Sequence, residues 1–372
     1  MRHILTTLLT EPSIVTRVLA VLAVASLGLF ACGTDLEKAV SDEAFQVAAD
    51  PEPEPEDPEP EEPEPEEPED TRPRSHLTGE PIDEELLDRP QLLVKIENSP
   101  QSRPQSGLDV ADVVYEERVE GGVTRFVALF HSEVPQVAGP IRSARPVTAQ
   151  IMRGYGPSGF AYSGARGEVQ RMLAQTPSIL MTEGHRGFYR DGSRSAPHNL
   201  YIDATETLAG AIDRGAEPFT EVGWHFDADP PGGALSCPDD AEQCTDPGAA
   251  VDVRMSRAFT TNWEYDDQAE VYRRGQNGQR FTVTGEGRIG AANVVVLDTR
   301  HYVGASGYPE TDVTTDGAEA VVLRDGRRYE AVWSKPTPDD PLLILTPDGD
   351  PFPLKPGATW VHLPDSVPDI TE

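Results

Sequence analysis

Residues 91–131 read QLLVKIENSPQSRPQSGLDVADVVYEERVEGGVTRFVALFH, and they decide how the first half of this chain folds. The stretches 91–97, 111–120 and 123–131 have the apolar content and the length of strands. The last two flank Gly121-Gly122, and glycine supplies the positive φ angles that a tight hairpin turn needs. We therefore expect an antiparallel hairpin preceded by one further strand.

The hairpin carries a carboxylate where an apolar side chain would be expected. If Gly121-Gly122 is a two-residue turn, Glu117 faces Phe126 across the hairpin, and Arg118 faces Arg125 on the opposite side. Alternation along the strand then puts Glu117 on one face with apolar neighbours. A buried carboxylate is costly unless it is paired, so we expect Glu117 either to meet an arginine or to have a functional role.

The chain after the hairpin favours short helices with strands between them. Helices are expected at 146–153, 168–174 and 204–214, and a strand at 159–163. Residues 90–226 are therefore expected to form a mixed α/β (α+β) domain.

A β-rich domain is expected over residues 251–366, where Asp325-Gly326 marks a tight turn between two apolar strands. Between the two domains lies 227–250, which is rich in Pro, Gly and Asp, and which we interpret as an inserted loop. It holds Cys237 and Cys244, an even pair for which an oxidising compartment favours a disulfide. Metal binding by the two cysteines is the alternative.

The N-terminus has the features of an exported lipoprotein. The apolar run 18–30 is too short to span a bilayer comfortably and fits the core of a signal peptide, residues 1–31. The run ends in Leu29-Phe30-Ala31-Cys32, which resembles a lipobox in which Cys32 receives the lipid. A plain signal peptide with an incidental cysteine is the alternative. Several acyl chains on one cysteine would hold the protein to the membrane.

A linker, residues 32–89, follows the lipobox and contains an acidic, proline-rich spacer. Residues 51–70 consist only of Pro, Glu and Asp, so they favour extended polyproline II and reach roughly 60 Å at about 3.1 Å per residue. The spacer would lift a domain off the membrane, into or through a wall layer. The whole chain has a net charge of −33, which argues against nucleic acid as a partner.

Arginine is concentrated between residues 139 and 200 of this otherwise acidic chain. Eight arginines stand there against three acids, and the stretch 139–146, GPIRSARP, places Arg142 and Arg145 beside turn residues. The planar guanidinium group suits phosphate and carboxylate groups, so these arginines are candidates for an anion site. The alternative is that they pair with the surplus carboxylates of the chain itself.

His198, in the stretch SAPHNLY, is a candidate proton carrier near neutral pH. The alternative is a loop histidine that makes a structural hydrogen bond. The sequence contains no motif of the zinc proteases, the P-loop nucleotide-binding proteins or the serine hydrolases. We therefore expect none of those classes and no metal site, and the sequence names no cofactor.

Six stretches resemble signature sequences of the YerB-like lipoproteins, whose folded region consists of an N-terminal and a C-terminal domain of unknown function. These stretches are residues 94–130, 139–146, 195–201, 263–274, 317–335 and 348–364. The resemblance extends over nearly the whole chain from 91 to 364, and it implies an envelope lipoprotein with a two-part folded region. It implies no reaction, because the activity of that family is not established.

A second resemblance, of architecture only, is to the LytR-CpsA-Psr phosphotransferases, which attach glycopolymers to the cell wall. It rests on a strand pair followed by a Pro/Arg turn, without the signature sequences of that family. The residues that it implicates are Arg125, Arg142 and Arg145 as pyrophosphate clamps, with Glu116, Glu117 or Glu120 as acids on a magnesium ion.

Together these observations predict a lipid-anchored protein on the extracytoplasmic face of the cell membrane, acting as a binding or accessory protein of the envelope. Its ligand would be a cell-wall polymer that bears phosphate or carboxylate groups. Two alternatives stay open: a phosphotransferase of the type above, and a structural lipoprotein that binds another envelope protein. The first two require the arginines to converge, and the enzyme also requires acids beside them. The predicted anion site consists of Glu117, Arg125, Arg142, Arg145 and His198.

Overall fold

The computed structural model describes residues 70–234, 248–285, 287–304, 307 and 309–368. The predicted signal peptide and nearly all of the proline-rich spacer lie outside the described residues. The same holds for Cys32, Cys237 and Cys244, so the structure does not bear on lipidation or on a disulfide.

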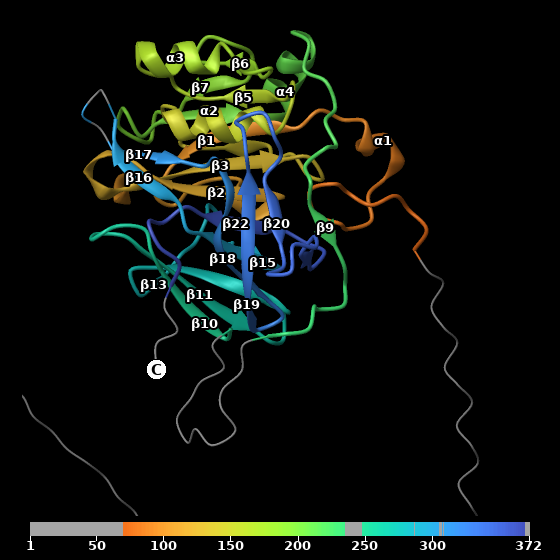
Figure 1. Cartoon of the computed structure of the whole chain (residues 1–372). Helices are drawn as coiled ribbons and strands as arrows, with labels where there is room; N and C mark the ends of the chain where they lie inside the picture. Colours follow the sequence, from red (N-terminus) through yellow and green to blue (C-terminus); the bar gives the residue numbers. More distant parts are fainter. Residues whose placement is uncertain (1–69, 235–247, 286, 305–306, 308, 369–372) are drawn as a thin grey trace, which may run out of the picture. The chain divides into compact units, whose positions relative to one another are not determined.

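Ten strands form one mixed sheet that draws on both halves of the chain (Figure 1). Its order is β20-β19-β18-β15-β22-β2-β3-β1-β5-β6. The last strand of the chain, β22, lies between β15 and β2 and runs parallel to both. The bounds are β1 (Leu92–Glu97), β2 (Val113–Arg118), β3 (Thr124–Phe130), β5 (Gly159–Ala161), β6 (Ile179–Met181), β15 (Asn293–Leu297), β18 (Thr315–Arg324), β19 (Arg327–Lys335), β20 (Leu343–Leu345) and β22 (Thr359–His362).

Smaller sheets and short helices surround this large sheet. A five-stranded sheet consists of β10 (Ala250–Arg254), β11 (Thr260–Asp266), β12 (Val271–Gln276), β13 (Gln279–Arg280) and β14 (Gly290–Ala291). Three further sheets are β4 (Val137–Ala138) with β8 (Leu200–Asp203) and β7 (Phe188–Arg190), β16 (Arg300–Val303) with β17 (Pro309–Asp312), and β9 (His225–Phe226) with β21 (Pro353–Leu354). The helices are α1 (Glu84–Leu87), α2 (Pro146–Arg153), α3 (Gly167–Leu173) and α4 (Ala204–Ile212).

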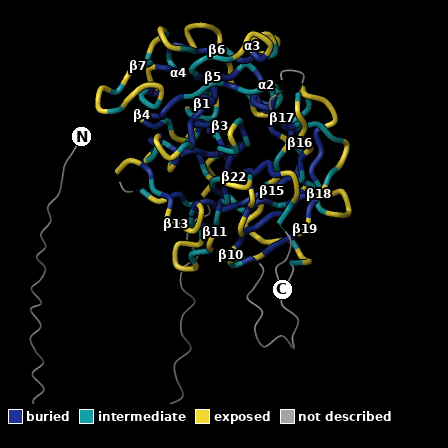
Figure 2. The backbone as a smooth tube through the Cα atoms, turned by 90° about the vertical axis from the view of Figure 1, so that its left-hand side faces the viewer, coloured by how far each residue is buried: buried dark blue, intermediate teal, exposed yellow. Residues whose placement is uncertain are grey.

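Both faces of the large sheet are buried, which Figure 2 shows as dark blue strands inside an exposed rim. Side chains alternate along each strand, so Val295 and Leu297 join one hydrophobic core while Val294 and Val296 join the other. Helices α2 and α3 pack against the first core, and we call that side the α2 face. Helix α4 and the five-stranded sheet pack against the second core, and we call that side the β11 face.

The structure confirms the expected helices but corrects the fold class of the first part. Helix α2 spans the predicted residues, and α4 begins at the predicted cap, where the Asp203 carboxylate accepts a hydrogen bond from the Glu206 amide at 2.9 Å. The described chain is nevertheless sheet-rich, and the N-terminal domain is mostly β rather than mixed α/β. The additional strands there have two to four residues, too short to show an alternating pattern in the sequence.

The register of the predicted hairpin is wrong by one residue. The turn has three residues, Glu120–Gly122, with a φ of 73° at both glycines, so Arg118 pairs with Thr124 and Glu117 pairs with Arg125. Arg125 therefore lies on the same face as Glu117, and the predicted opposition of Arg118 and Arg125 does not occur. In the described part of the chain, no helix is long and apolar enough to cross a membrane.

Candidate anion site

The predicted site lies where several strands of the large sheet terminate side by side, near the carboxyl ends of β1 and β2. We call this row of strand ends the C-terminal edge of the sheet. Strand β1 is parallel to β5, and β5 to β6, while β1 and β2 both run antiparallel to β3. Strands β1, β2, β5 and β6 therefore point the same way, and the loops that follow them meet at this edge. In open sheets with parallel strands, ligands bind at the carboxyl ends of the strands.

A row of charged residues crosses three strands on the α2 face of this edge. Arg125 on β3 is the direct cross-strand neighbour of Glu117 on β2 and of Glu97 on β1. Side chains that pair in this way have Cβ atoms about 5 Å apart. The register thus places a guanidinium group between two carboxylates.

Both carboxylates nevertheless form their ion pairs with other cations. Lys95 forms a fully buried ion pair with Glu117, and the Thr148 hydroxyl of α2 donates to the same carboxylate at 3.2 Å. Glu97 contacts Arg142 Nε at 3.2 Å and His198 Nδ1 at 2.9 Å. Burial in water-poor surroundings makes such pairing necessary for both acids.

Arg125 is left without a carboxylate partner. Within the described residues it makes no ion pair, and its one hydrogen bond runs from Nη1 to the Ser143 carbonyl at 2.7 Å. The pKa of Arg125 is lowered to about 10, first by burial and then by the nearby charges of Arg145 and Arg142, while the charges of Glu117 and Glu120 oppose this shift. A guanidinium has five N–H donors, so most of the donors of Arg125 remain available.

Arg145 is a further cation near Arg125, and it pairs with Glu120. It donates to Glu120 from Nη2 at 2.5 Å and from Nε at 2.9 Å, and to the Ala144 carbonyl at 2.8 Å. Although burial opposes it, the hydrogen bond from Arg145 lowers the pKa of the Glu120 carboxyl. Both side chains stay partly exposed, at 15% for Arg145 and 26% for Glu120, so a ligand can reach this side from solvent.

The loop that carries His198 is hydrogen-bonded to the loop that follows β1. Arg194 donates to the carbonyls of Ser102 at 2.9 Å and Pro104 at 2.8 Å. His198 Nδ1 lies 2.9–3.0 Å from both oxygens of Glu97. The other ring nitrogen, Nε2, has no hydrogen-bond partner among the described residues. The carboxylate orients the imidazole, and Nε2 remains available to a ligand.

The structure therefore brings the five predicted site residues together around one edge of the sheet. Sequence reasoning missed Lys95 and Glu97, which neutralise or orient the predicted residues. A signal was present, because the two charges alternate within the apolar strand 91–97 and therefore share a face. Three other arginines of the stretch pair with acids at the surface instead, namely Arg153 with Asp339, Arg186 with Glu206 and Arg190 with Glu183.

Glu116 points away from this cluster, to the β11 face. It binds Arg274 Nη2 at 3.1 Å and His362 Nδ1 at 3.1 Å, and it accepts from the Thr261 hydroxyl at 2.8 Å. Burial opposes ionisation, but Arg274 and His362 outweigh it and lower the pKa of the Glu116 carboxyl well below its usual range. Glu116 thus anchors the five-stranded sheet and takes no part in the anion site.

The acids beside the arginines are not arranged as metal ligands. Glu117 and Glu120 each have a cation as partner, and Glu116 lies on the opposite face. In the ranges that the structure describes, no three His, Cys, Asp or Glu side chains form a group that could hold a metal ion.

Comparison with known proteins places the chain in a family. Residues 77–217 match the N-terminal domain, and residues 251–361 the C-terminal domain, of a protein family of unknown function (DUF3048). The chain belongs to this YerB-like family. It is 27% identical over 306 residues to YerB of Bacillus subtilis (strain 168), which is named as a lipoprotein; the match covers 80% of this chain and 87% of YerB.

The fold of the YerB-like family is also known from experiment. The crystal structure of YerB from Bacillus subtilis superposes with a TM-score of 0.67 at 25% sequence identity, covering 80% of this chain and 98% of that chain. The comparisons thus support the predicted family. They assign no reaction and no site residues to it.

Proposed function

We propose that this member of the YerB-like family is a lipid-anchored envelope protein on the extracytoplasmic face of the membrane, and that its arginine cluster binds an anionic envelope polymer. The lipobox-like sequence before Cys32, the acidic spacer and the naming of YerB as a lipoprotein support the anchoring. Phosphate- or carboxylate-bearing polymers of the envelope are the anions within reach of the spacer. A disulfide between Cys237 and Cys244 suits the same compartment.

The observation that carries the anion site is Arg125. The cluster contains four cations, Lys95, Arg125, Arg142 and Arg145, against three acids, and every cation except Arg125 has an acid partner. Internal ion pairing therefore explains the other three cations and leaves one positive charge over. The Arg125 guanidinium is partly buried and feels the positive charges of Arg142 and Arg145, so a bound anion would stabilise it. Each charge-assisted hydrogen bond to such an anion is worth about 1.5–3 kcal/mol.

Substitution of Arg125 tests the site. We expect Arg125→Ala to weaken binding of pyrophosphate and of teichoic polymer by about 10- to 100-fold, which is the loss of one charge-assisted contact. Arg125→Lys should weaken it as well, because a point charge cannot replace a planar fork. Isothermal titration calorimetry measures the affinity, and the melting temperature is recorded on the same samples.

Arg190→Ala is the matched control, since Arg190 belongs to the same arginine-rich stretch but pairs with Glu183 at the surface. Its affinity should equal that of the wild type. A wild-type chain that binds neither probe, together with a large fall in melting temperature for Arg125→Ala, would show that Arg125 serves the fold alone. The same experiment separates the anion site from the purely structural alternative, because a structural lipoprotein would bind neither probe.

The anchor is tested by Cys32→Ala. We expect the substituted chain to leave the membrane fraction or to remain unprocessed, because the acyl chains on Cys32 supply the membrane affinity. Fractionation and metabolic labelling with a palmitate analogue measure this. Unchanged fractionation with full labelling would refute the lipobox.

A further inference from the structure

A polar groove opens at the C-terminal edge of the sheet, beside the ends of β15 and β22. Strand β22 runs parallel to both β15 and β2, so all three end at this edge. Asp298 directly follows β15, and Asp365 follows β22 by three residues. Both line the groove, whose volume is about 730 Å³. Small-molecule sites typically have about 300–1,000 Å³, and in open sheets they lie at the carboxyl ends of parallel strands.

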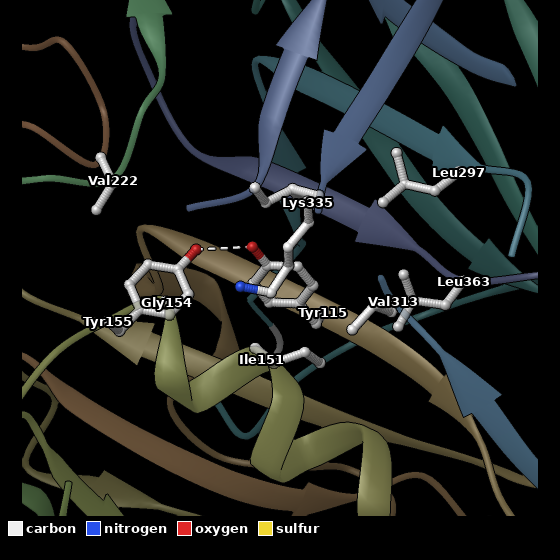
Figure 3. Close-up of a pocket in the computed structure, with 10 residues that line it drawn as sticks. Tyr115, Ile151, Gly154, Tyr155, Val222, Leu297, Val313, Lys335 and Leu363 are labelled. Carbon is white, nitrogen blue, oxygen red and sulfur yellow. Dashed lines mark hydrogen bonds between the residues drawn. The ribbon is translucent and has the colours of Figure 1, made fainter. Parts of the chain in front are cut away.

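Three segments of the chain converge on this groove because apolar residues next to it pack together in the core. Leu297, Val313 and Leu363 line one small cavity of the hydrophobic core (Figure 3). That cavity has room for about one water molecule. Each of the three residues lies within two positions of an acid that lines the groove, namely Asp298, Asp312 and Asp365. The core contacts thus hold the three acids around one space.

Two of these three carboxylates already have a cation beside them. Arg300 Nη2 lies 3.0 Å from Asp312 Oδ2, and Arg118 Nη1 lies 3.6 Å from Asp365 Oδ2. The carboxylate of Asp298 has neither an ion pair nor a hydrogen bond among the described residues. In those residues no three acids or histidines form a group that could hold a metal ion. The groove therefore repels an anion and offers a cation only one unpaired carboxylate.

The lining of the groove mixes donors and acceptors of hydrogen bonds. Arg300, Thr314 and Thr315 line it together with the acids, and the side chain of Arg300 is 74% exposed. A carboxylate only accepts, a guanidinium only donates, and a threonine hydroxyl does both. A hydroxyl group of a ligand also donates and accepts, so a ligand with several hydroxyl groups and no charge matches this lining.

The hairpin formed by β16 and β17 contacts both the groove and the anion site. Arg300, its first residue, lines the groove. Glu310 of β17 instead lines a small pocket together with Glu120 and Arg145 of the arginine cluster. A polymer that passes over this hairpin can therefore place one unit in the groove and another at the arginine cluster.

We propose that the groove binds an uncharged sugar unit of the envelope polymer whose anionic group the site around Arg125 binds. This proposal rests on the proposed function and names the class of polymer, a glycopolymer that carries sugars beside its phosphate or carboxylate groups. Asp298 accepts hydrogen bonds from the hydroxyl groups of the sugar, and Arg300 donates to its oxygens.

The probes are pyrophosphate, poly(glycerol phosphate), and the same polymer with glucosyl or with N-acetylglucosaminyl substituents, titrated into the full chain by calorimetry. Pyrophosphate reports on the anion site alone. We expect at least one of the two substituted polymers to bind about tenfold or more tightly than the unsubstituted one, because only the substituted polymer brings a sugar to the groove.

Asp298→Ala removes the unpaired acceptor, so it should lower the affinity for the substituted polymer to that for the unsubstituted one and leave pyrophosphate binding unchanged. Arg300→Ala should also weaken binding of the substituted polymer alone, and its exposed position lets it decide the matter if Asp298→Ala does not fold. Asp316→Ala is the matched control, since Asp316 is exposed on β18 and does not line the groove, and it should change no affinity.

Equal affinity of the wild type for the substituted and the unsubstituted polymers would overturn the sugar groove and leave the anion site in place. Unchanged affinities in both Asp298→Ala and Arg300→Ala would do the same. A loss of pyrophosphate binding in Asp298→Ala would also overturn it, because Asp298 would then act through the anion site. Failure of every probe to bind the wild type would instead refute the anion site, and the sugar groove with it.

Discussion

Glu116 and Glu117 are consecutive residues, yet they belong to different parts of the molecule. The alternation of a strand sends Glu116 to Arg274 and the five-stranded sheet, and Glu117 to Lys95 and helix α2. The sequence placed Glu117 among apolar neighbours and predicted that it meets an arginine or has a functional role, but its ion-pair partner is a lysine. Sequence reasoning could not identify that cation as Lys95, because the pairing of β1 with β3 is a contact between distant segments.

The Lys95–Glu117 pair leads to a prediction about stability. Both side chains are fully buried, so Lys95→Met leaves an uncompensated charge and should lower the free energy of unfolding by about 3–5 kcal/mol. The double variant Lys95→Met/Glu117→Leu removes both charges and should recover most of that loss. Urea denaturation of the wild type, the single and the double variant measures this. A double variant no more stable than the single one would contradict the pairing.

Among the elements, hairpins whose turn has a characteristic two-residue sequence were the easiest to predict. Asp325 and Gly326 have φ angles of 55° and 70°, as a two-residue hairpin turn requires, and β18 and β19 pair around them. The first hairpin failed in register because Glu120 joined the two glycines in the turn. A turn one residue longer exchanges which side chains oppose each other, and composition alone does not reveal it.

Two glycines at this edge of the sheet should respond differently to alanine. Gly139 has a φ of 148°, and a Cβ there would lie 2.7 Å from Tyr201 Cδ1, so Gly139→Ala must displace either the Tyr201 ring or the segment that carries Arg142. Gly121 has a φ of 73° in open space, so Gly121→Ala meets no clash and should cost only about 1–2 kcal/mol, the cost of left-handed backbone for a residue with a Cβ. We expect Gly139→Ala to lower both stability and anion affinity, and Gly121→Ala to lower stability slightly and leave affinity intact. Thermal unfolding and calorimetry with pyrophosphate measure the two effects, and equal affinities would show that the segment absorbs the change.

At the scale of the whole molecule, the large sheet joins what the sequence suggested were two domains. The boundary was placed at 227–250 from local composition, and the family comparison also divides the chain near there. Strand β22 nevertheless pairs with β2 across more than half of the folded chain, with Val113 opposite Thr359. Composition and periodicity describe neighbours in sequence, so they cannot reveal a pairing of this kind.

This topology predicts that the two halves do not fold independently. Removing residues 359–372 deletes β22 and should expose the edges of both β15 and β2 in the middle of the sheet. It also removes His362, a partner of Glu116. We therefore expect the truncated chain to lose cooperative unfolding and to aggregate, whereas a chain that lacks only 369–372 should unfold like the wild type. Circular dichroism on heating, with light scattering, measures both. A truncated chain whose first half keeps a sharp transition would show that residues 70–226 form a stable unit without β22, and that the shared sheet is a docking contact between two domains.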